Sequence, residues 1–218
     1  MLWAARDMKK LLSLFHNSER VMYFAIPTIN MGTWLFAPLI LRLWIHRDGL
    51  FDVYIYGLLA VISCAISMRE HKQFFHFSTN THHRYAVIVS VGNIFMVVAS
   101  IPATMKLGVH GLLYVWLLSE LAQMLMIYSE NRRLFARDPS ITIGPAFRLI
   151  LMMGASFAFC SGLLLAVQGR ALWQLCIAGC VGTALVGVAS YYLFGVYRVR
   201  ALLAGRLRGR LPAWLPGV

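Results

Sequence analysis

The sequence predicts an all-α, polytopic membrane protein with six transmembrane helices, and three observations lead to this prediction. First, 60% of the 218 residues are hydrophobic and 13% are charged, so the chain is too apolar to bury its hydrophobic surface in one soluble core. Second, six apolar runs have about the length that a helix needs to cross a bilayer core of roughly 30 Å. Third, the runs at 85–103 and 109–128 are separated by little more than the sequence MKLG, so the two helices must be antiparallel neighbours.

Residues 1–20 are predicted to form a cytoplasmic segment that lies in the membrane interface. Leu11 and Phe15 are placed to share an apolar face opposite Lys9 and Lys10, which is the pattern of an interfacial amphipathic helix. The apolar run is short and is followed by HNSER without a small-residue cleavage site, which argues against a signal peptide.

The first span, 21–44, is predicted to be bent, because Pro27 and Pro38 each remove a backbone donor and crowd the carbonyl four residues earlier. Asn30 and Thr33 lie beside the bend. Because lipid cannot satisfy such polar groups, we expect both side chains to face protein or water.

The remaining spans are predicted at 53–68, 85–103, 109–128, 149–167 and 172–197. Together with the first span they make a six-helix domain over 21–197, and 198–218 form a basic cytoplasmic tail. Residues 69–84 mix charged and aromatic side chains, which is typical of a helix that emerges through the headgroups. Gly179 and Gly182 are among the small residues of the last span, whose spacing favours close approach to another helix.

The distribution of positive charge predicts the orientation. Of the 20 Lys and Arg residues, all but Arg42, Arg47, Lys106 and Arg170 fall on the side shared by the two termini, which is therefore predicted to be cytoplasmic. The formal net charge of +12 is explained by topology and anionic lipid, because the basic residues form no stripe with interleaved aromatics that would indicate a nucleic-acid partner.

Five polar residues inside the spans are candidates for transport or ion coupling: Glu120, Asn93, Gln123, Arg42 and Asn30. A carboxylate at membrane depth is rare, and Glu120 has no Lys or Arg in its own span, so desolvation favours the protonated form that a coupling acid requires. The structural alternative is a neutral Glu120 that hydrogen-bonds Asn93 across the hairpin. For Arg42 the alternative is a side chain that snorkels to the outer headgroups.

No catalytic, cofactor or metal site is predicted, and the chain is not expected to be an enzyme. His71, His76, His82 and His83 cluster on one side, but a di-iron site needs more ligands than these four, so they are interpreted as polar residues at headgroup level. The four cysteines all lie within apolar runs and predict neither disulfides nor a zinc site.

Three stretches carry a resemblance to a known family: AARDMKKLLSLFHNSER before the first span, IPTINMGTWLFAPLILRLWI within it, and KLGVHGLLYVWLLSELAQ in the hairpin. In this order they resemble the C-terminal lobe of polysaccharide and O-antigen flippases of the multidrug/oligosaccharidyl-lipid/polysaccharide (MOP) exporter superfamily. Members of that superfamily are usually built from two six-helix lobes around a central cavity, and this chain supplies one.

The resemblance implies a half-length or truncated transporter of the bacterial inner (cytoplasmic) membrane. It would export lipid-linked oligosaccharide or polysaccharide repeat units by alternating access. The expected partners are membrane lipids, the lipid-linked sugar and a second six-helix lobe. Thr28, Asn30, Thr33 and Glu120 are the residues expected to face that lobe or a cavity. The alternatives are a lobe of a drug or cation antiporter of the same superfamily, and a small membrane subunit that does not transport.

Overall fold

The computed structural model describes residues 8–46, 50–78, 81–135 and 138–199, and these form six long α-helices and no strand. The helices are α1 (Met8–Ile45), α2 (Val53–Ser78), α3 (His82–Leu107), α4 (Val109–Leu134), α5 (Gly144–Val167) and α6 (Leu172–Leu193). All six are long and apolar enough to cross a membrane, as the sequence predicts for a multi-pass protein.

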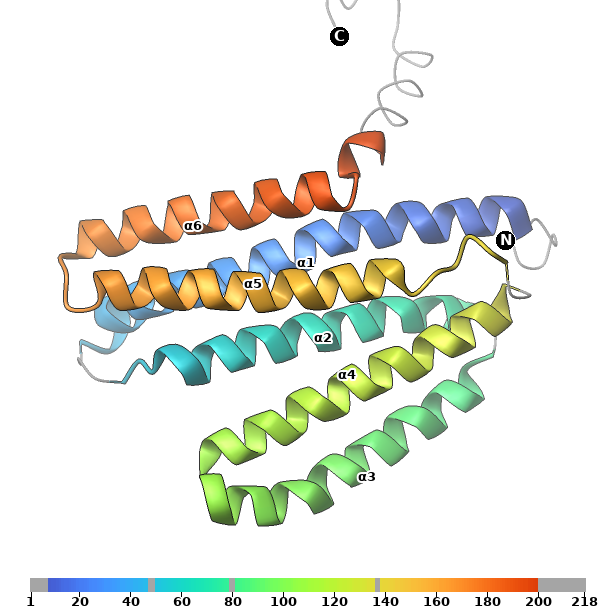
Figure 1. Ribbon diagram of the computed structural model, residues 1–218, viewed down its shortest axis with the longest axis horizontal. Helices are drawn as coiled ribbons and strands as arrows, with labels where there is room; N and C mark the ends of the chain where they lie inside the picture. The colour runs from blue at the N-terminus through green and yellow to red at the C-terminus, as the bar shows by residue number, and fades with distance from the viewer. Residues whose placement is uncertain (1–7, 47–49, 79–80, 136–137, 200–218) are drawn as a thin grey trace, which may run out of the picture.

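The helices run alternately up and down, so one end of the bundle holds the starts of α1, α3 and α5 and the ends of α2, α4 and α6 (Figure 1). We call this the basic end. Its described Lys and Arg residues are Lys9, Lys10, Arg20, Arg69, Lys72, Arg84, Arg132, Arg133, Arg148 and Arg198, whereas the far end has Arg42, Lys106 and Arg170.

The first helix lies at the centre of the packing, between α6 and α2 (Figure 1). Its apolar side chains Met31, Trp34 and Leu35 are fully buried in the main core. The predicted close approach of the last span is confirmed, because a Cβ added at Gly182 would lie 2.7 Å from a methyl carbon of Leu35. Glycine at this position therefore lets α6 pack directly on α1.

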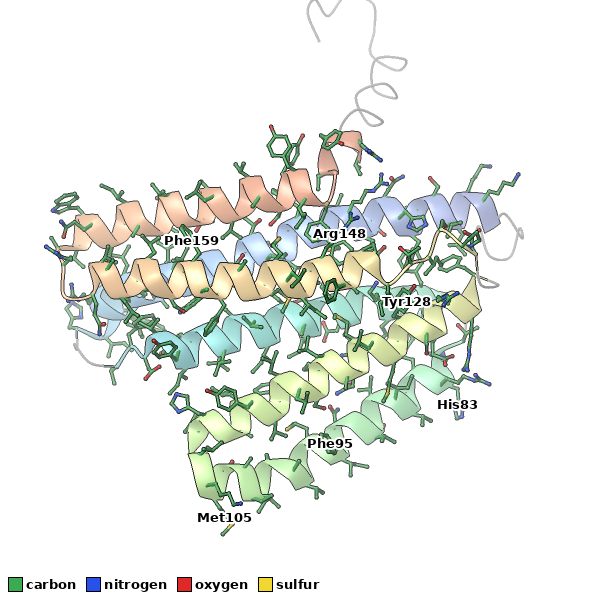
Figure 2. All side chains as sticks on the ribbon, viewed as in Figure 1. His83, Phe95, Met105, Tyr128, Arg148 and Phe159 are labelled. Carbon is green, nitrogen blue, oxygen red and sulfur yellow. The ribbon has the colours of Figure 1, made fainter. Side chains whose placement is uncertain are left out.

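The predicted hairpin is also confirmed, since α3 and α4 pack side by side and a single residue, Gly108, joins them. Gly108 has φ +60°, a left-handed conformation that glycine adopts without strain. The hairpin contacts the rest of the bundle mainly through α4, which packs on α2. Phe95 and Met105 on α3 are exposed, and Figure 2 shows them on the hairpin at the edge of the molecule.

One correction concerns the predicted interfacial segment. From Met8 onward it is the beginning of α1, continuous with the first predicted span. Leu11 and Phe15 do not form a free apolar face, because both are buried in a cluster that includes Phe75 of α2 and Leu134 of α4. An apolar face of this spacing suits a neighbouring helix as well as a membrane interface, and here protein covers it.

Candidate functional site

Two basic residues of α2 lie inside the bundle rather than at its surface. Arg69 is 9% exposed and Lys72 is 2% exposed. Because they are three residues apart in a helix, they project from nearly the same face, about one turn apart. Buried charges are costly unless each one is paired, so their partners define the site.

Lys72 pairs with Glu19 of α1, an ion pair whose two side chains are both almost fully buried. The hydroxyl of Tyr23 donates a second hydrogen bond to the same carboxylate, 2.9 Å from Oε1. The ammonium group also lies 5.6 Å from the ring centroid of Phe15 and 5.8 Å from that of Tyr23, within the range of a cation–π contact. The charge of Lys72 is thus matched by one carboxylate and two aromatic faces.

Arg69 pairs with side chains of α4, which also packs on α2. Its Nη1 lies 3.0 Å from Oε2 of Glu120 and donates at 2.6 Å to Oε1 of Gln123, both on α4. The Gln123 amide donates to the hydroxyl of Ser119, which in turn donates to the backbone carbonyl of Gly92 on α3. A continuous polar chain therefore runs from α2 through α4 to α3.

The two pairs connect α2 to one acid on α1 and to another on α4. Glu19 and Glu120 balance Lys72 and Arg69, so the group is neutral when all four are ionised. Uptake of a proton or a cation at Glu120 would weaken its attraction to Arg69, while the Arg69–Gln123 hydrogen bond and the apolar packing of α4 on α2 would remain. The strength of this contact between helices therefore depends on charge, and we call the four residues Glu19, Arg69, Lys72 and Glu120 the clasp.

The structure adds a partner for Glu120 and changes its expected exposure. Glu120 does have a counter-ion, Arg69, although this comes from a different helix. It is also 3% exposed within the bundle, so it does not belong to an open surface facing a second lobe. Trp116, one turn earlier on α4, adds an indole N–H at 3.4 Å.

Of the other candidates, only Gln123 joins Glu120. Asn93 is exposed on α3, and Ser119, rather than Asn93, makes the polar contact across the hairpin. Arg42 is at the far end, where Nη1 donates at 2.9 Å to the carbonyl of Arg170 in the turn between α5 and α6.

Asn30 and Thr33 lie on a groove between α1 and α2. Their side chains donate to the carbonyls of Ile26 and Ile29 in their own helix, at 2.9 Å each. The groove has a volume of about 350 Å³ and is otherwise lined largely by apolar residues, among them Trp34. Thr28 instead packs against α6, where a Cβ added at Gly187 would lie 3.3 Å from its methyl carbon.

The loop after α4 adds one more shifted ionisable group. The hydroxyl and backbone N–H of Ser140 both donate to the carboxylate of Asp138, and they hold the pKa of Asp138 below its usual value. Within the described ranges, no group of three or more His, Cys, Asp or Glu side chains is placed to hold a metal ion. His71 instead lies 3.4 Å from the hydroxyl of Ser18, and His76 lies 3.1 Å from that of Thr81.

Sequence reasoning missed Glu19, Tyr23, Arg69 and Lys72 as members of the site. It assigned the first to the interfacial segment and the last two to the headgroup region. One signal was available: Arg69 and Lys72 share a helical face, and the chain has only eight acidic residues to pair with its many cations.

No protein-family model matches the chain. Neither a curated protein nor a solved structure matches it at a significant level.

Proposed function

We propose that this chain is one six-helix lobe of a membrane transporter that exports lipid-linked oligosaccharide or polysaccharide units by alternating access. The observation that carries the proposal is the pair of buried ionic contacts on α2, with Lys72 held by Glu19 of α1 and Arg69 held by Glu120 of α4. The sequence resemblance to MOP flippases supplies the substrate class.

The energetics favour a functional role for these contacts. Replacing a buried ion pair by well-packed apolar residues is often neutral or stabilising, so such a pair is weak evidence of a purely structural role. Ionisable side chains within membrane-spanning helices typically mark ion or substrate pathways. A clasp that depends on charge fits a protein whose helices must change their packing during a transport cycle.

In the proposed cycle Glu120 is the coupling acid. When it is ionised, Arg69 holds α4, and with it the α3–α4 hairpin, against α2. When it takes up a proton or cation, this attraction weakens, which makes a shift of the hairpin relative to α2 and the helices packed on it less costly. Glu19 and Lys72 keep α1 and α2 together in both states.

The proposed setting is the bacterial inner membrane with the basic end in the cytoplasm, which the excess of Lys and Arg at that end supports. The groove beside Asn30 and Thr33 is the proposed face toward a second lobe, either a separate chain or another copy of this one. Both side chains keep hydrogen-bonding capacity beyond their bonds to α1, which lipid would leave unsatisfied.

The test is restoration of surface O-antigen in a bacterial strain that lacks its O-antigen flippase. The chain is expressed alone and together with an N-terminal six-helix lobe of the same superfamily. We expect wild type to restore export with a suitable partner, and Glu120→Gln to reduce export and its dependence on external pH. Asn93→Ala, an exposed change on the neighbouring helix, is the matched control and should export normally.

Other outcomes separate the alternatives. Increased drug resistance without O-antigen would favour a lobe of a drug antiporter. Neither activity with any partner, from a stable and correctly inserted chain, would favour a subunit that does not transport. Normal export with normal pH dependence in Glu120→Gln would remove the coupling role.

A further inference from the structure

A second site lies at the basic end, and neither Arg69 nor Glu120 lines it. It is a pocket of about 410 Å³ formed where α1 passes the start of α5 and the end of α6. Its polar lining includes Arg20, Arg148, Arg198, Tyr23, Tyr192 and Tyr197. Figure 2 shows Arg148 at the start of α5, on the side of α1 and α6. The volume falls within the range of roughly 300–1,000 Å³ that is usual for small-molecule sites.

The three arginines lie at one depth relative to the apolar spans. Arg20 directly precedes the apolar part of α1, Arg148 directly precedes that of α5, and Arg198 follows the last apolar residues after α6. Each therefore sits where a transmembrane helix meets the headgroups. The tyrosines of the pocket suit the same depth, because an aromatic ring with a polar tip favours the interface.

The positive charge of this pocket is largely uncompensated. In the described part of the chain Arg20 and Arg148 form no ion pair. The guanidinium group of Arg198 donates to the hydroxyl of Tyr197 at 3.4 Å and lies over the ring of the same tyrosine, but it has no acidic partner there either. The one carboxylate that lines the pocket, Glu19, is already paired with Lys72. Three guanidinium groups, from α1, from α5 and from the segment after α6, thus line a pocket whose only described carboxylate is already paired.

We propose that this pocket binds the headgroup of an anionic lipid that carries two phosphates, the chemical class of cardiolipin. Guanidinium groups bind phosphate oxygens through paired N–H donors, and Tyr192 and Tyr197, which also line the pocket, place further hydroxyl groups beside them. The positive end of the α5 dipole adds to the same field, since Pro145 in its first turn also lines the pocket. Basic pockets between transmembrane helices on the cytoplasmic side are typical sites for such headgroups.

This inference does not depend on the transport proposal. The pocket shares no arginine with the clasp on α2, and lipid binding is measured without any transport assay. A failure of O-antigen export and a failure of lipid binding are therefore distinguishable results.

The test is native mass spectrometry of the purified full chain in detergent, titrated with cardiolipin and, separately, with phosphatidylcholine. We expect one cardiolipin to be retained in preference to phosphatidylcholine. Arg148→Gln and Arg198→Gln should each weaken it about fivefold, as a typical contribution of a basic residue at an anionic surface implies. The triple variant with Arg20→Gln should weaken it about a hundredfold.

The matched control is Arg132→Gln, which removes an exposed charge of the same end but outside the pocket. It should change cardiolipin binding less than twofold. A loss of affinity as large as in Arg148→Gln or Arg198→Gln would overturn the proposal, because binding would then depend only on the total charge of this end. Arg148 and Arg198 are exposed, so the single variants should remain folded. If the triple variant does not fold, the affinities of the single variants for cardiolipin test the proposal. Displacement of cardiolipin by inorganic pyrophosphate at equal concentration would assign the pocket to a soluble phosphate compound and overturn the lipid.

Discussion

Replacing Lys72 with methionine tests the buried pairing directly, because it removes the ammonium group and nearly keeps the shape of the side chain. Lys72 is 2% exposed and pairs with Glu19, so the substitution leaves a buried carboxylate without its counter-ion. Breaking a buried pair from one side costs about 3–5 kcal/mol. Tyr23 still donates to Glu19, and methionine can still pack against Phe15, which places the expected loss near the lower limit, about 3 kcal/mol.

The assay is thermal unfolding of the purified protein in detergent. For a chain of this size, a loss of about 3 kcal/mol lowers Tm by roughly 6–12 °C. The control Lys106→Met removes an exposed lysine at the far end and should leave the stability within about 0.5 kcal/mol of wild type. The double variant Glu19→Gln with Lys72→Met removes both charges and should regain most of the lost stability. A double variant as unstable as Lys72→Met, or Lys72→Met with a wild-type Tm, would refute the pairing as the cause.

Two further predictions concern helix packing and orientation. Gly182→Leu should lower the free energy of unfolding by about 1–3 kcal/mol, measured by thermal unfolding, because a Cβ at this position meets Leu35 of α1. Gly162→Leu, on an open face of α5, should leave the stability nearly unchanged. Equal effects of the two substitutions would contradict the packing account. In a background without the four native cysteines, Ser129→Cys should react with a membrane-impermeant maleimide only from the cytoplasmic side and Lys106→Cys only from the opposite side, and the reverse pattern would invert the proposed topology.

The helices were predictable because the bilayer imposes a local requirement on each of them. A spanning segment must be long, apolar and internally hydrogen-bonded, so hydropathy alone located all six. The hairpin followed from the short connection at Gly108. Glu120 and Gln123 were recognisable for the same local reason, because a polar residue is unusual anywhere in an apolar run.

The partners of these residues were not predictable, because pairing is a property of the tertiary structure. Arg69 is 51 residues from Glu120 in the sequence, and Lys72 is 53 residues from Glu19. A cation that follows an apolar run normally marks the membrane boundary, so the sequence placed Arg69 and Lys72 in the headgroups. The acids on α1 and α4 bury both cations between helices, which their positions along the sequence do not reveal.

The contact between α1 and α6 joins helices that are synthesised well apart in time, because four helices lie between them in the sequence. At 5–20 residues per second, the ribosome needs on the order of 10 s to make the chain between them. During that interval Leu35 and Phe36 on α1 lack the contacts that Gly182 and Gly179 of α6 later make with them. The contacts of α1 with α2 can already form. These six helices can therefore close into one bundle only after α6 has been made, and a chain that stops before α6 would present this side of α1 to the proteases that survey unassembled membrane proteins.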